Sequence, residues 1–388
     1  MKPILIDLSF VSRETITTSI PIVIFRLLSG IEVSEKKNIK LLFDSANSEF
    51  LHSLIPDYDF LTIKMYHNRK YGFDLRLFSI PFQYKRIVDG SGCSAVFCPS
   101  DGNVYSVFKL KIPEIVEIND LKRLKKDFGG YDISSGLWHK LTFIINKKSY
   151  SRIVKRARLI FTISEYTKKD LLAFFPSLEE NKISILYPSI AMSHTSERPS
   201  SFIKDKNYIL DVNTITPSKN TLTLIKAYKS LPERDDYYLV LVGRATSYWD
   251  NTIVPYLEAH HLEEKVILLQ NLSDAEMRYV YDNACLFVTP SLHEGFGFTP
   301  LEAAICEAPV ISSMCESLPE VTMGLVHYYE PAEDDQALAN AIHNVLTNKP
   351  SKKELKCIAA RYRDAYSPSR QAERFMDMVR EKVVNCEN

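Results

Sequence analysis

The sequence lacks any long uninterrupted apolar run. A membrane-spanning helix needs about 18 or more consecutive apolar residues, whereas the best candidate, "IPIVIF" at 20–25, stops at Arg26. The N-terminal stretch "MKPILIDLSF" is interrupted by Asp7 and is followed by no small-residue cleavage site, so it lacks the features of a secretory signal. These absences predict a cytoplasmic protein without a transmembrane segment.

Cysteine pairs and nucleotide-binding glycine motifs are also missing. The seven cysteines form no Cys-x-x-Cys pair and none has a histidine at zinc-ligand spacing, which argues against structural zinc and fits a reduced compartment. No Walker lysine motif occurs. The stretch "GSGCSA" at 90–95 fits Gly-x-Gly-x-x-Ala, but it precedes a predicted strand, whereas a dinucleotide fingerprint follows one. We therefore expect no bound cofactor.

Net charge is absent overall, because 48 Lys and Arg balance 48 Asp and Glu. Residues 104–158 nevertheless contain 13 basic and five acidic residues, a local charge of +8 that leaves −8 for the rest. Aromatic and aliphatic residues are interleaved with this charge, a mixture typical of surfaces that contact an anionic membrane. The alternative is a set of solvated lysines on helices packed against a sheet. No nucleic-acid recognition motif accompanies the charge, so no nucleic-acid partner is expected.

Short apolar, β-rich runs alternate with helix-length segments along the whole chain. Runs of this kind predict parallel sheets covered by helices on both faces, hence an α/β fold. A chain of 388 residues is too long for one ordinary core, so two such domains are expected. The predicted strands are 3–8, 39–43, 60–65, 94–98, 114–118, 159–163, 183–187, 208–212, 237–243, 265–269, 285–290, 309–313 and 326–329.

A segment rich in proline and serine separates the two series of strands. It reads "YPSIAMSHTSERPSSFIKDK" at 187–206 and has little apolar periodicity, as expected of a linker. We place the domains at 1–190 and 206–365, with 191–205 between them.

The C-terminal tail, 366–388, is predicted to form one amphipathic helix. Ser367 is its N-cap and Pro368 its first residue. This helix can pack on either domain, including a return to the first. Its apolar face consists of Ala372, Phe375, Met376, Val379 and Val383.

The stretch "HEGFGFTPLEA" at 293–303 has two glutamates eight positions apart around a glycine turn. It follows a predicted buried strand and leads into a helix, with Thr299 as N-cap and Pro300 at the first helical position. Open α/β sheets bind ligands at this edge, and the free N–H groups of a helix start favour an anion. Gly295 and Gly297 allow close approach of the backbone.

The two glutamates have alternative interpretations. Thr299-x-x-Glu302 matches a capping box, in which Glu302 only reaches back to the Thr299 N–H. Glu294 can be a surface carboxylate. Two carboxylates beside an anion-binding turn also suit a ligand with hydroxyls on both sides of a phosphate, which describes a nucleotide-sugar.

The segment "PSLHEGFGFTPLEAAICEAPVISSMCESLPEV" at 290–321 resembles the signature region of family-4-type retaining glycosyltransferases of the GT-B fold. The likeness extends over the whole second domain and implies two Rossmann-like domains facing each other across a cleft. It also implies that Glu294 contacts the donor sugar and Glu302 the ribose hydroxyls. The turn and helix start implied at the diphosphate and sugar are Gly295, Phe296, Gly297, Phe298 and Thr299.

The resemblance also identifies positions where this sequence departs from the family. The second domain of the family begins with an Arg and a Lys that neutralise the diphosphate. In "DVNTITPSKN" at 211–220, Lys219 falls on the lysine and Thr214 on the arginine. Arg244, at the end of the next strand, is a candidate replacement for that arginine. The alternative for Lys219 is a solvated residue at a helix start.

The first domain resembles the family more faintly. "EINDLKRL" at 117–124 aligns with a His-Asp-Leu segment whose histidine contacts the donor sugar; Asn119 takes the place of that histidine and Asp120 remains. The family thus implies Glu294, Asp120 and Asn119 as catalytic positions. The first loop, 17–25, has no glycine where many members are glycine-rich. Ser164 is predicted to be an N-cap.

The resemblance implies a retaining transferase that moves a sugar from a UDP- or GDP-linked donor to a glycan or polyprenyl-linked acceptor in bacterial surface polysaccharide assembly. The acceptor is expected on the first domain. No Asp-x-Asp serves a metal, so metal independence is expected; the acidic pair at 234–236 precedes a strand. The alternatives are a GT-B nucleotide-sugar epimerase, a sugar-phosphate-dependent transferase, or an inactive relative acting as a binding partner.

Overall fold

The computed structural model describes residues 2–65, 76–100, 108–125, 137–200 and 206–384. The chain divides into two compact units. The first comprises Met1–Lys125, Ile133–Ser189 and Ser367–Asn388, and the second is built around Ile190–Tyr366.

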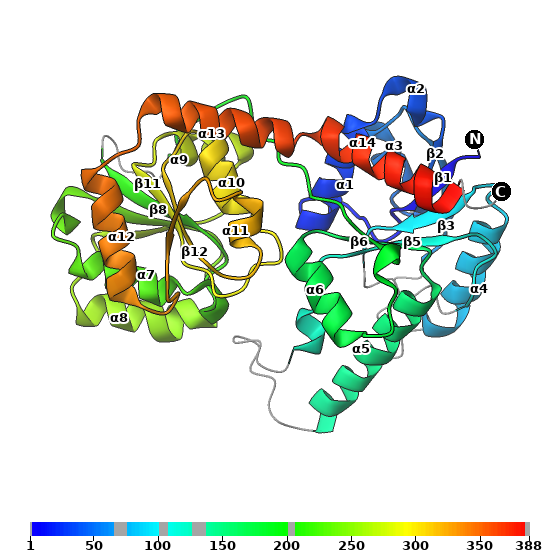
Figure 1. Ribbon diagram of the computed structural model, residues 1–388, viewed down its shortest axis with the longest axis horizontal. Helices are drawn as coiled ribbons and strands as arrows, with labels where there is room; N and C mark the ends of the chain where they lie inside the picture. The colour runs from blue at the N-terminus through cyan, green and yellow to red at the C-terminus, as the bar shows by residue number, and fades with distance from the viewer. Residues whose placement is uncertain (1, 66–75, 101–107, 126–136, 201–205, 385–388) are drawn as a thin grey trace. The chain divides into compact units, whose positions relative to one another are not determined.

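The first unit contains a seven-stranded parallel sheet in the order β3-β2-β1-β4-β5-β6-β7 (Figure 1). The strand order steps outward from β1 in both directions, as in doubly wound folds. The strands are β1 Ile4–Asp7, β2 Ile39–Asp44, β3 Asp59–Ile63, β4 Ala95–Cys98, β5 Glu114–Ile118, β6 Leu159–Thr162 and β7 Ile183–Ile185. The α-helices are α1 Ser19–Gly30, α2 Val33–Lys36, α3 Ser48–Leu54, α4 Arg76–Asp89, α5 Leu137–Arg156, α6 Glu165–Phe174 and α14 Pro368–Val379.

The second unit repeats this plan with six parallel strands in the order β10-β9-β8-β11-β12-β13. The strands are β8 Tyr208–Val212, β9 Tyr238–Val242, β10 Val266–Leu269, β11 Leu286–Thr289, β12 Val310–Ser313 and β13 His327–Tyr329. The α-helices are α7 Thr221–Ser230, α8 Val254–Ala259, α9 Asp274–Asp282, α10 Phe298–Ile305, α11 Leu318–Val321, α12 Asp335–Thr347 and α13 Lys352–Ala365. A short 3₁₀ turn spans Pro217–Lys219.

All thirteen predicted strands are present, and the α/β prediction is confirmed. Strands β5 and β8 match their predicted ranges to the residue, and the others differ by one or two residues at an end. Most of their residues are buried, with β3, β10 and β13 more exposed, which explains why continuous apolar runs, and not alternating ones, identified most of them. Among the described residues, no helix is long and apolar enough to cross a membrane.

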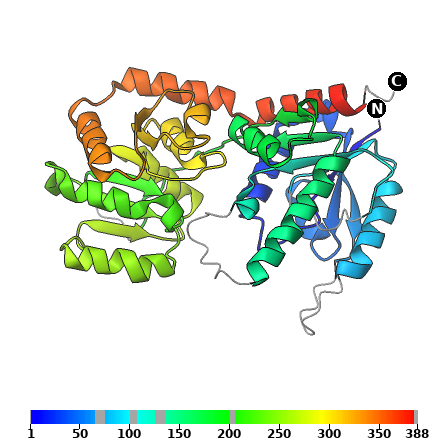
Figure 2. The ribbon, with the colours of Figure 1, turned by 60° about the horizontal axis from the view of Figure 1, so that its bottom comes forward.

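Helix α14 packs in the first unit, although it is the last α-helix of the chain. Its predicted cap is confirmed, because the Ser367 side chain accepts a hydrogen bond from the Arg370 N–H. It lies along α1 (Figure 1, Figure 2). Gly30 is required at the start of this contact, since a Cβ there would lie 2.1 Å from the Pro368 carbonyl oxygen. The predicted apolar face of α14 is buried in the first core.

Phe375 anchors this face. Its ring is fully buried, with ring centroids 4.9 Å from Phe97 on β4 and 5.7 Å from Phe161 on β6. The tail therefore supplies part of the core that covers the sheet's centre.

We expect Phe375→Ala to lower the free energy of unfolding of the first unit by about 3–5 kcal/mol, because it opens a cavity in a close-packed core. Equilibrium urea unfolding followed by circular dichroism measures the change. Glu373→Ala, an exposed position on the same helix, should stay within about 0.5 kcal/mol of the wild type. Equal stability of the two variants would show that α14 does not contribute to the core.

Candidate functional site

The candidate site of the second unit lies where β8, β9, β11 and β12 end. The carboxyl ends of parallel strands meet at one edge of a sheet, and the loops that follow them are the ligand-binding positions of open α/β folds. The chain reverses its direction of winding between β8 and β11, which are neighbours in the sheet. The loops after these two strands carry Lys219 and Glu294.

Asn220 holds the Lys219 loop against the end of β11. Its backbone is left-handed, with φ 57°, a conformation that asparagine tolerates better than most residues. Its side-chain amide donates to the carbonyls of Pro290 at 3.1 Å and Ala332 at 2.7 Å, and accepts from the Thr223 hydroxyl at 2.7 Å. Asn220 therefore fixes the neighbouring lysine by tying its loop to two others.

Lys219 forms an ion pair with Glu294. The same carboxylate oxygen accepts a hydrogen bond from the Ser291 hydroxyl at 2.9 Å. The side chains of Lys219 and Glu294 retain 20% and 12% of their exposure, so this pair is neither fully solvated nor sealed in the core. The solvated-lysine interpretation of Lys219 is therefore wrong, because its cation sits beside a carboxylate at the sheet edge.

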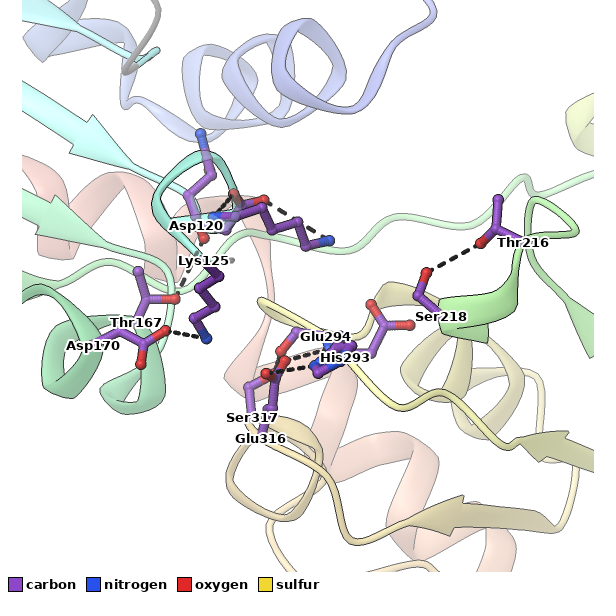
Figure 3. Close-up of polar contacts among 12 residues, drawn as sticks. Asp120, Lys125, Thr167, Asp170, Thr216, Ser218, His293, Glu294, Glu316 and Ser317 are labelled. Atoms are coloured by element: carbon purple, nitrogen blue, oxygen red, sulfur yellow. Dashed lines mark hydrogen bonds and ion pairs between the residues drawn. The ribbon is translucent and has the colours of Figure 1, made fainter. Parts of the chain in front are cut away.

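A second loop, after β12, forms hydrogen bonds with the turn that contains Glu294. The Glu316 carboxylate accepts from the Glu294 N–H at 2.7 Å and lies 3.0 Å from the His293 ring nitrogen. The Ser317 hydroxyl lies 2.7 Å from the Glu294 carbonyl and 3.1 Å from that of Phe296. Figure 3 shows these side chains converging on the turn.

The glycine turn ends differently from the prediction. Helix α10 begins at Phe298 with Gly297 as its N-cap, so Thr299 is not the cap and Pro300 is not the first helical residue. Gly297 has φ 97°, which favours glycine, and a Cβ there would lie 2.6 Å from Leu318. The tight turn, and not side-chain capping chemistry, decides where this helix starts.

Glu302 is therefore not part of a Thr299 capping box, since Thr299 is already inside the helix. Its carboxylate instead accepts a hydrogen bond from the Tyr281 hydroxyl at 3.0 Å. Tyr281 is buried on α9, and burial together with this carboxylate raises its pKa well above the usual range, so it remains a donor. The neutral Tyr281 hydroxyl thus fixes the Glu302 carboxylate through this hydrogen bond.

Asp211 lies fully buried on β8, behind the Lys219 loop. One carboxylate oxygen accepts from the Asn213 amide at 2.7 Å, and the other has no hydrogen-bond partner among the described residues. Burial raises the pKa of Asp211 to about 7, while the Asn213 hydrogen bond and the Lys219 charge oppose the shift and Glu294 adds to it. Near neutral pH this acid is therefore partly protonated.

The remaining residues of the second unit that were predicted to bind the sugar donor differ in exposure. The Phe296 ring is 2% exposed and packs edge-on against Phe298 and Tyr366, so its side chain belongs to the core and only its backbone faces the turn. Thr214 and Arg244 follow β8 and β9 and are exposed. Arg244 thus lies at the predicted sheet edge, but within the described residues no hydrogen bond or ion pair joins it to Lys219.

The predicted residues of the first unit follow β5. Asp120 accepts from the Lys122 N–H at 2.9 Å, and the Asn119 side-chain nitrogen is buried without a hydrogen-bond partner in the described structure. Lys125 pairs with Asp170 at 2.6 Å (Figure 3). The Ser164 cap on α6 is confirmed, since its side chain accepts from the Thr167 N–H.

No group of three or more His, Cys, Asp or Glu side chains among the described residues is arranged to hold a metal ion. The acidic pair at 234–236 lies before β9, at the amino end of the strand as predicted.

Sequence reasoning missed three residues that organise the site: Asp211, Glu316 and Ser317. Asp211 was visible as a charge inside an otherwise apolar strand, a pattern that marks a buried polar group. Glu316 and Ser317 gave no such signal, because their partners lie more than twenty positions earlier and most of them are backbone groups.

Comparison with known proteins gives a consistent family assignment. Residues 193–363 match the family described as "Glycosyl transferases group 1". The O-antigen chain mannosyltransferase RfbU of Salmonella typhimurium is 33% identical over 195 residues, which are 50% of this chain and 52% of that relative. The chain thus spans about half the length of this curated relative.

Solved structures extend the likeness to both units. A glycosyltransferase from Rickettsia africae matches with a TM-score of 0.72 at 16% identity, covering 99% of each chain. Anabaena HepE, solved with UDP and glucose, matches with a TM-score of 0.68 at 13% identity, covering 98% of this chain and 100% of that one. At these identities the likeness establishes the fold alone.

The family match fills nearly the whole second unit, which carries the ion pair and the glycine turn, and the structural matches cover both sheets. Residues 193–363 of the chain therefore resemble the group 1 glycosyltransferases, and the chain has the two-domain GT-B fold of solved glycosyltransferases.

Proposed function

We propose that the protein is a retaining, metal-independent glycosyltransferase that moves a hexose from a UDP- or GDP-linked donor to a glycan or polyprenyl-linked acceptor in bacterial surface polysaccharide assembly. The observation that carries the proposal is the Lys219–Glu294 pair beside the start of α10. A cation, a carboxylate and the N-terminus of a helix meet at one sheet edge. The similarity to an O-antigen mannosyltransferase supports mannose as the first sugar to test.

The three groups suit the three parts of a nucleotide-sugar. Lys219 and the N–H groups of α10 favour the diphosphate. Glu294 accepts hydrogen bonds from the sugar hydroxyls, and Glu302, held by Tyr281, accepts from the ribose. Gly295 and Gly297 leave room for the ligand to approach the backbone.

The chemistry of this site is charge stabilisation at the leaving group. When the bond between the sugar and the diphosphate breaks, negative charge develops on the phosphate oxygens. Groups that already point at that position stabilise the charge without reorganising, which is the largest contribution in many enzymes. In this proposal Lys219 and the helix N–H groups fill that role.

The inactive-relative alternative rests on Thr214 and Asn119, which replace the arginine and histidine of the family pattern. An epimerase or a sugar-phosphate-dependent transferase would use the same nucleotide pocket. Donor turnover separates these alternatives, because an inactive relative binds without release and an epimerase changes the sugar without releasing nucleotide.

We expect wild-type protein to release nucleoside diphosphate from at least one member of a panel of UDP- and GDP-linked hexoses, GDP-mannose included. Because the proposed charge stabilisation uses N–H groups and Lys219, the rate should persist in EDTA. A coupled assay for released UDP or GDP measures both. Loss of activity in EDTA and its return with Mg²⁺ or Mn²⁺ would contradict metal independence, and binding without release would favour the inactive relative.

Glu294→Gln is expected to separate sugar contacts from nucleotide contacts. Loss of a charged hydrogen bond to the sugar should cost about 1.5–3 kcal/mol of transition-state stabilisation, which appears as a lower kcat/KM. Affinity for bare UDP or GDP should not fall, because the substitution removes the carboxylate that neutralises Lys219. Calorimetric titration measures this affinity.

The matched control for Glu294→Gln is Glu233→Gln, which removes a carboxylate paired with His343 before β9, away from the site. It should leave turnover unchanged. An equal loss of affinity for nucleotide and nucleotide-sugar in Glu294→Gln would mean that Glu294 contacts the nucleotide instead of the sugar.

The acceptor side of the proposal involves the membrane. Helix α5 buries Tyr150 and Val154 in a second hydrophobic cluster of the first unit, whereas Ile144 and Ile145 are 48% and 57% exposed. Lys147, Lys148, Arg152 and Lys155 are exposed on the same helix. We define these six exposed residues as the α5 patch, in which basic heads can meet anionic lipid while the isoleucines enter the interface.

Not all of the basic segment predicted from sequence takes part in this patch. Lys125 is already paired with Asp170, and residues 104–107 and 126–136 lie outside the described residues. Because Lys125 is already paired, the membrane proposal is concentrated on α5.

We expect the protein to sediment with vesicles containing anionic phosphatidylglycerol at low salt and to be released at high salt, because the attraction is electrostatic. Reversing Lys147, Lys148, Arg152 and Lys155 to Glu should abolish sedimentation. The matched control reverses Lys349, Lys352, Lys353 and Lys356, four exposed lysines at and before α13. Protein that stays in the supernatant at low salt would indicate a soluble acceptor.

A further inference from the structure

The turn that carries Glu294 is fixed on both sides of that residue by one neighbouring loop. Glu316 accepts from the Glu294 N–H at 2.7 Å, and the Ser317 hydroxyl lies 2.7 Å from the Glu294 carbonyl. The two peptide groups that flank the Glu294 Cα are therefore both held by residues 316 and 317. This leaves the side-chain torsions as the main remaining freedom of Glu294.

The side chain of Glu294 is held as well. Its carboxylate accepts from the Ser291 hydroxyl and pairs with Lys219. The other oxygen of Glu316 lies 3.0 Å from the His293 ring nitrogen, so that the preceding residue of the turn is attached to the same carboxylate. Figure 3 shows His293 and Glu294 on one side of this contact and Glu316 and Ser317 on the other.

The backbone at Glu316 argues against an incidental contact. Glu316 has φ 51°, a left-handed conformation that glycine adopts freely and that a glutamate rarely adopts. Residues held in this region persist only where their surroundings compensate. The hydrogen bonds of the Glu316 carboxylate to the turn are that compensation.

Glu316 also places a second carboxylate at the turn, within 2.7 Å of an N–H that would otherwise be available to an anion. The Glu294 N–H is therefore occupied by the protein itself. The anion-binding role remains with the N–H groups at the start of α10, beyond Gly297.

We propose that Glu316, supported by Ser317, is a positioning residue that holds the turn 293–296 so that Glu294 meets the reacting sugar in one orientation. The inference rests on the proposed transferase function. Catalysis depends on geometry to within a fraction of an ångström, and a displacement of about 1 Å can cost roughly a hundredfold in rate. Glu316 acts on the transition state through Glu294 and does not contact the nucleotide.

The discriminating variant is Glu316→Gly. Glycine removes the Cβ that disfavours φ 51°, but it also removes the carboxylate that bonds to the turn, so its two effects on stability oppose each other. If Glu316 only stabilised the fold, the substitution would change Tm and leave kcat unaltered. The positioning role predicts a small change in Tm, a fall of about tenfold or more in kcat for nucleoside diphosphate release, and little change in KM.

Two further variants make the measurement specific. Glu316→Gln keeps one oxygen that can accept from the Glu294 N–H, so its kcat should lie between those of Glu316→Gly and the wild type. Glu307→Gly is the matched control, since Glu307 is also a glutamate in the left-handed region, with φ 63°, at the end of α10 and outside the turn. It should leave kcat unchanged.

The probes are GDP-mannose and UDP-glucose for turnover, and GDP and UDP for binding. Unchanged kcat in Glu316→Gly, with an active wild type, would overturn the inference. A parallel loss of kcat and of nucleoside diphosphate affinity would also overturn it, because it would place Glu316 in direct contact with the nucleotide.

A measurement without turnover keeps the inference separate from the proposed function. Amide hydrogen exchange of the peptide spanning 291–297 should accelerate in Glu316→Gly and not in Glu307→Gly. If no donor is turned over by the wild type, the transferase proposal fails, while faster exchange still supports the positioning contact. Equal exchange in both variants would overturn it.

Discussion

The parallel pairing of β8 with β11 is the constraint on which the candidate site depends. Because these strands run in the same direction and are neighbours, the loops that leave their carboxyl ends start side by side. One loop carries Lys219 and the other carries Glu294, 75 positions later. An antiparallel pairing would place the two residues at opposite edges of the sheet, and neither local sequence could bring them together.

Charge balance is the second organising feature of this edge. Three carboxyl groups, Asp211, Glu294 and Glu316, gather around Lys219 and His293. Repulsion between these carboxyl groups is reduced in a different way for each one. Burial raises the pKa of Asp211 to about 7, Glu294 pairs with the lysine, and Glu316 accepts a hydrogen bond from the backbone. The result is a site rich in acceptors with one strong cation, which suits a ligand that combines hydroxyls with a diphosphate better than a polyanion.

Left-handed backbone positions connect the loops of the site. Asn220, Gly297 and Glu316 all have positive φ, and each lies where a loop must turn sharply beside another. Only Gly297 has the residue type that this conformation prefers without help. Asn220 and Glu316 use their side chains to bind neighbouring backbone groups, so the local cost of the conformation is offset by contacts that fix the loops of the candidate site.

The sequence by itself determined the layers of the fold. Buried parallel strands are continuous apolar runs, and this signal is local, so all thirteen were found from residue type and length alone. The caps at Ser164 and Ser367 and the apolar face of α14 were predictable for the same reason, since each depends on residues within one or two helical turns. The resemblance to a family located Lys219, Glu294 and Glu302 but not their partners.

Tertiary structure decided what depends on distant contacts. The start of α10 shifted from the predicted Thr299 cap because Gly297 packs against Leu318, which is remote in sequence. Glu302 accepts a hydrogen bond from Tyr281 and is not part of a capping box. Helix α14 packs in the first unit, where the Phe375 ring contacts Phe97 and Phe161. Glu316 and Ser317 act on backbone groups of another loop, and backbone groups are the same in every residue, so no sequence pattern could reveal that contact.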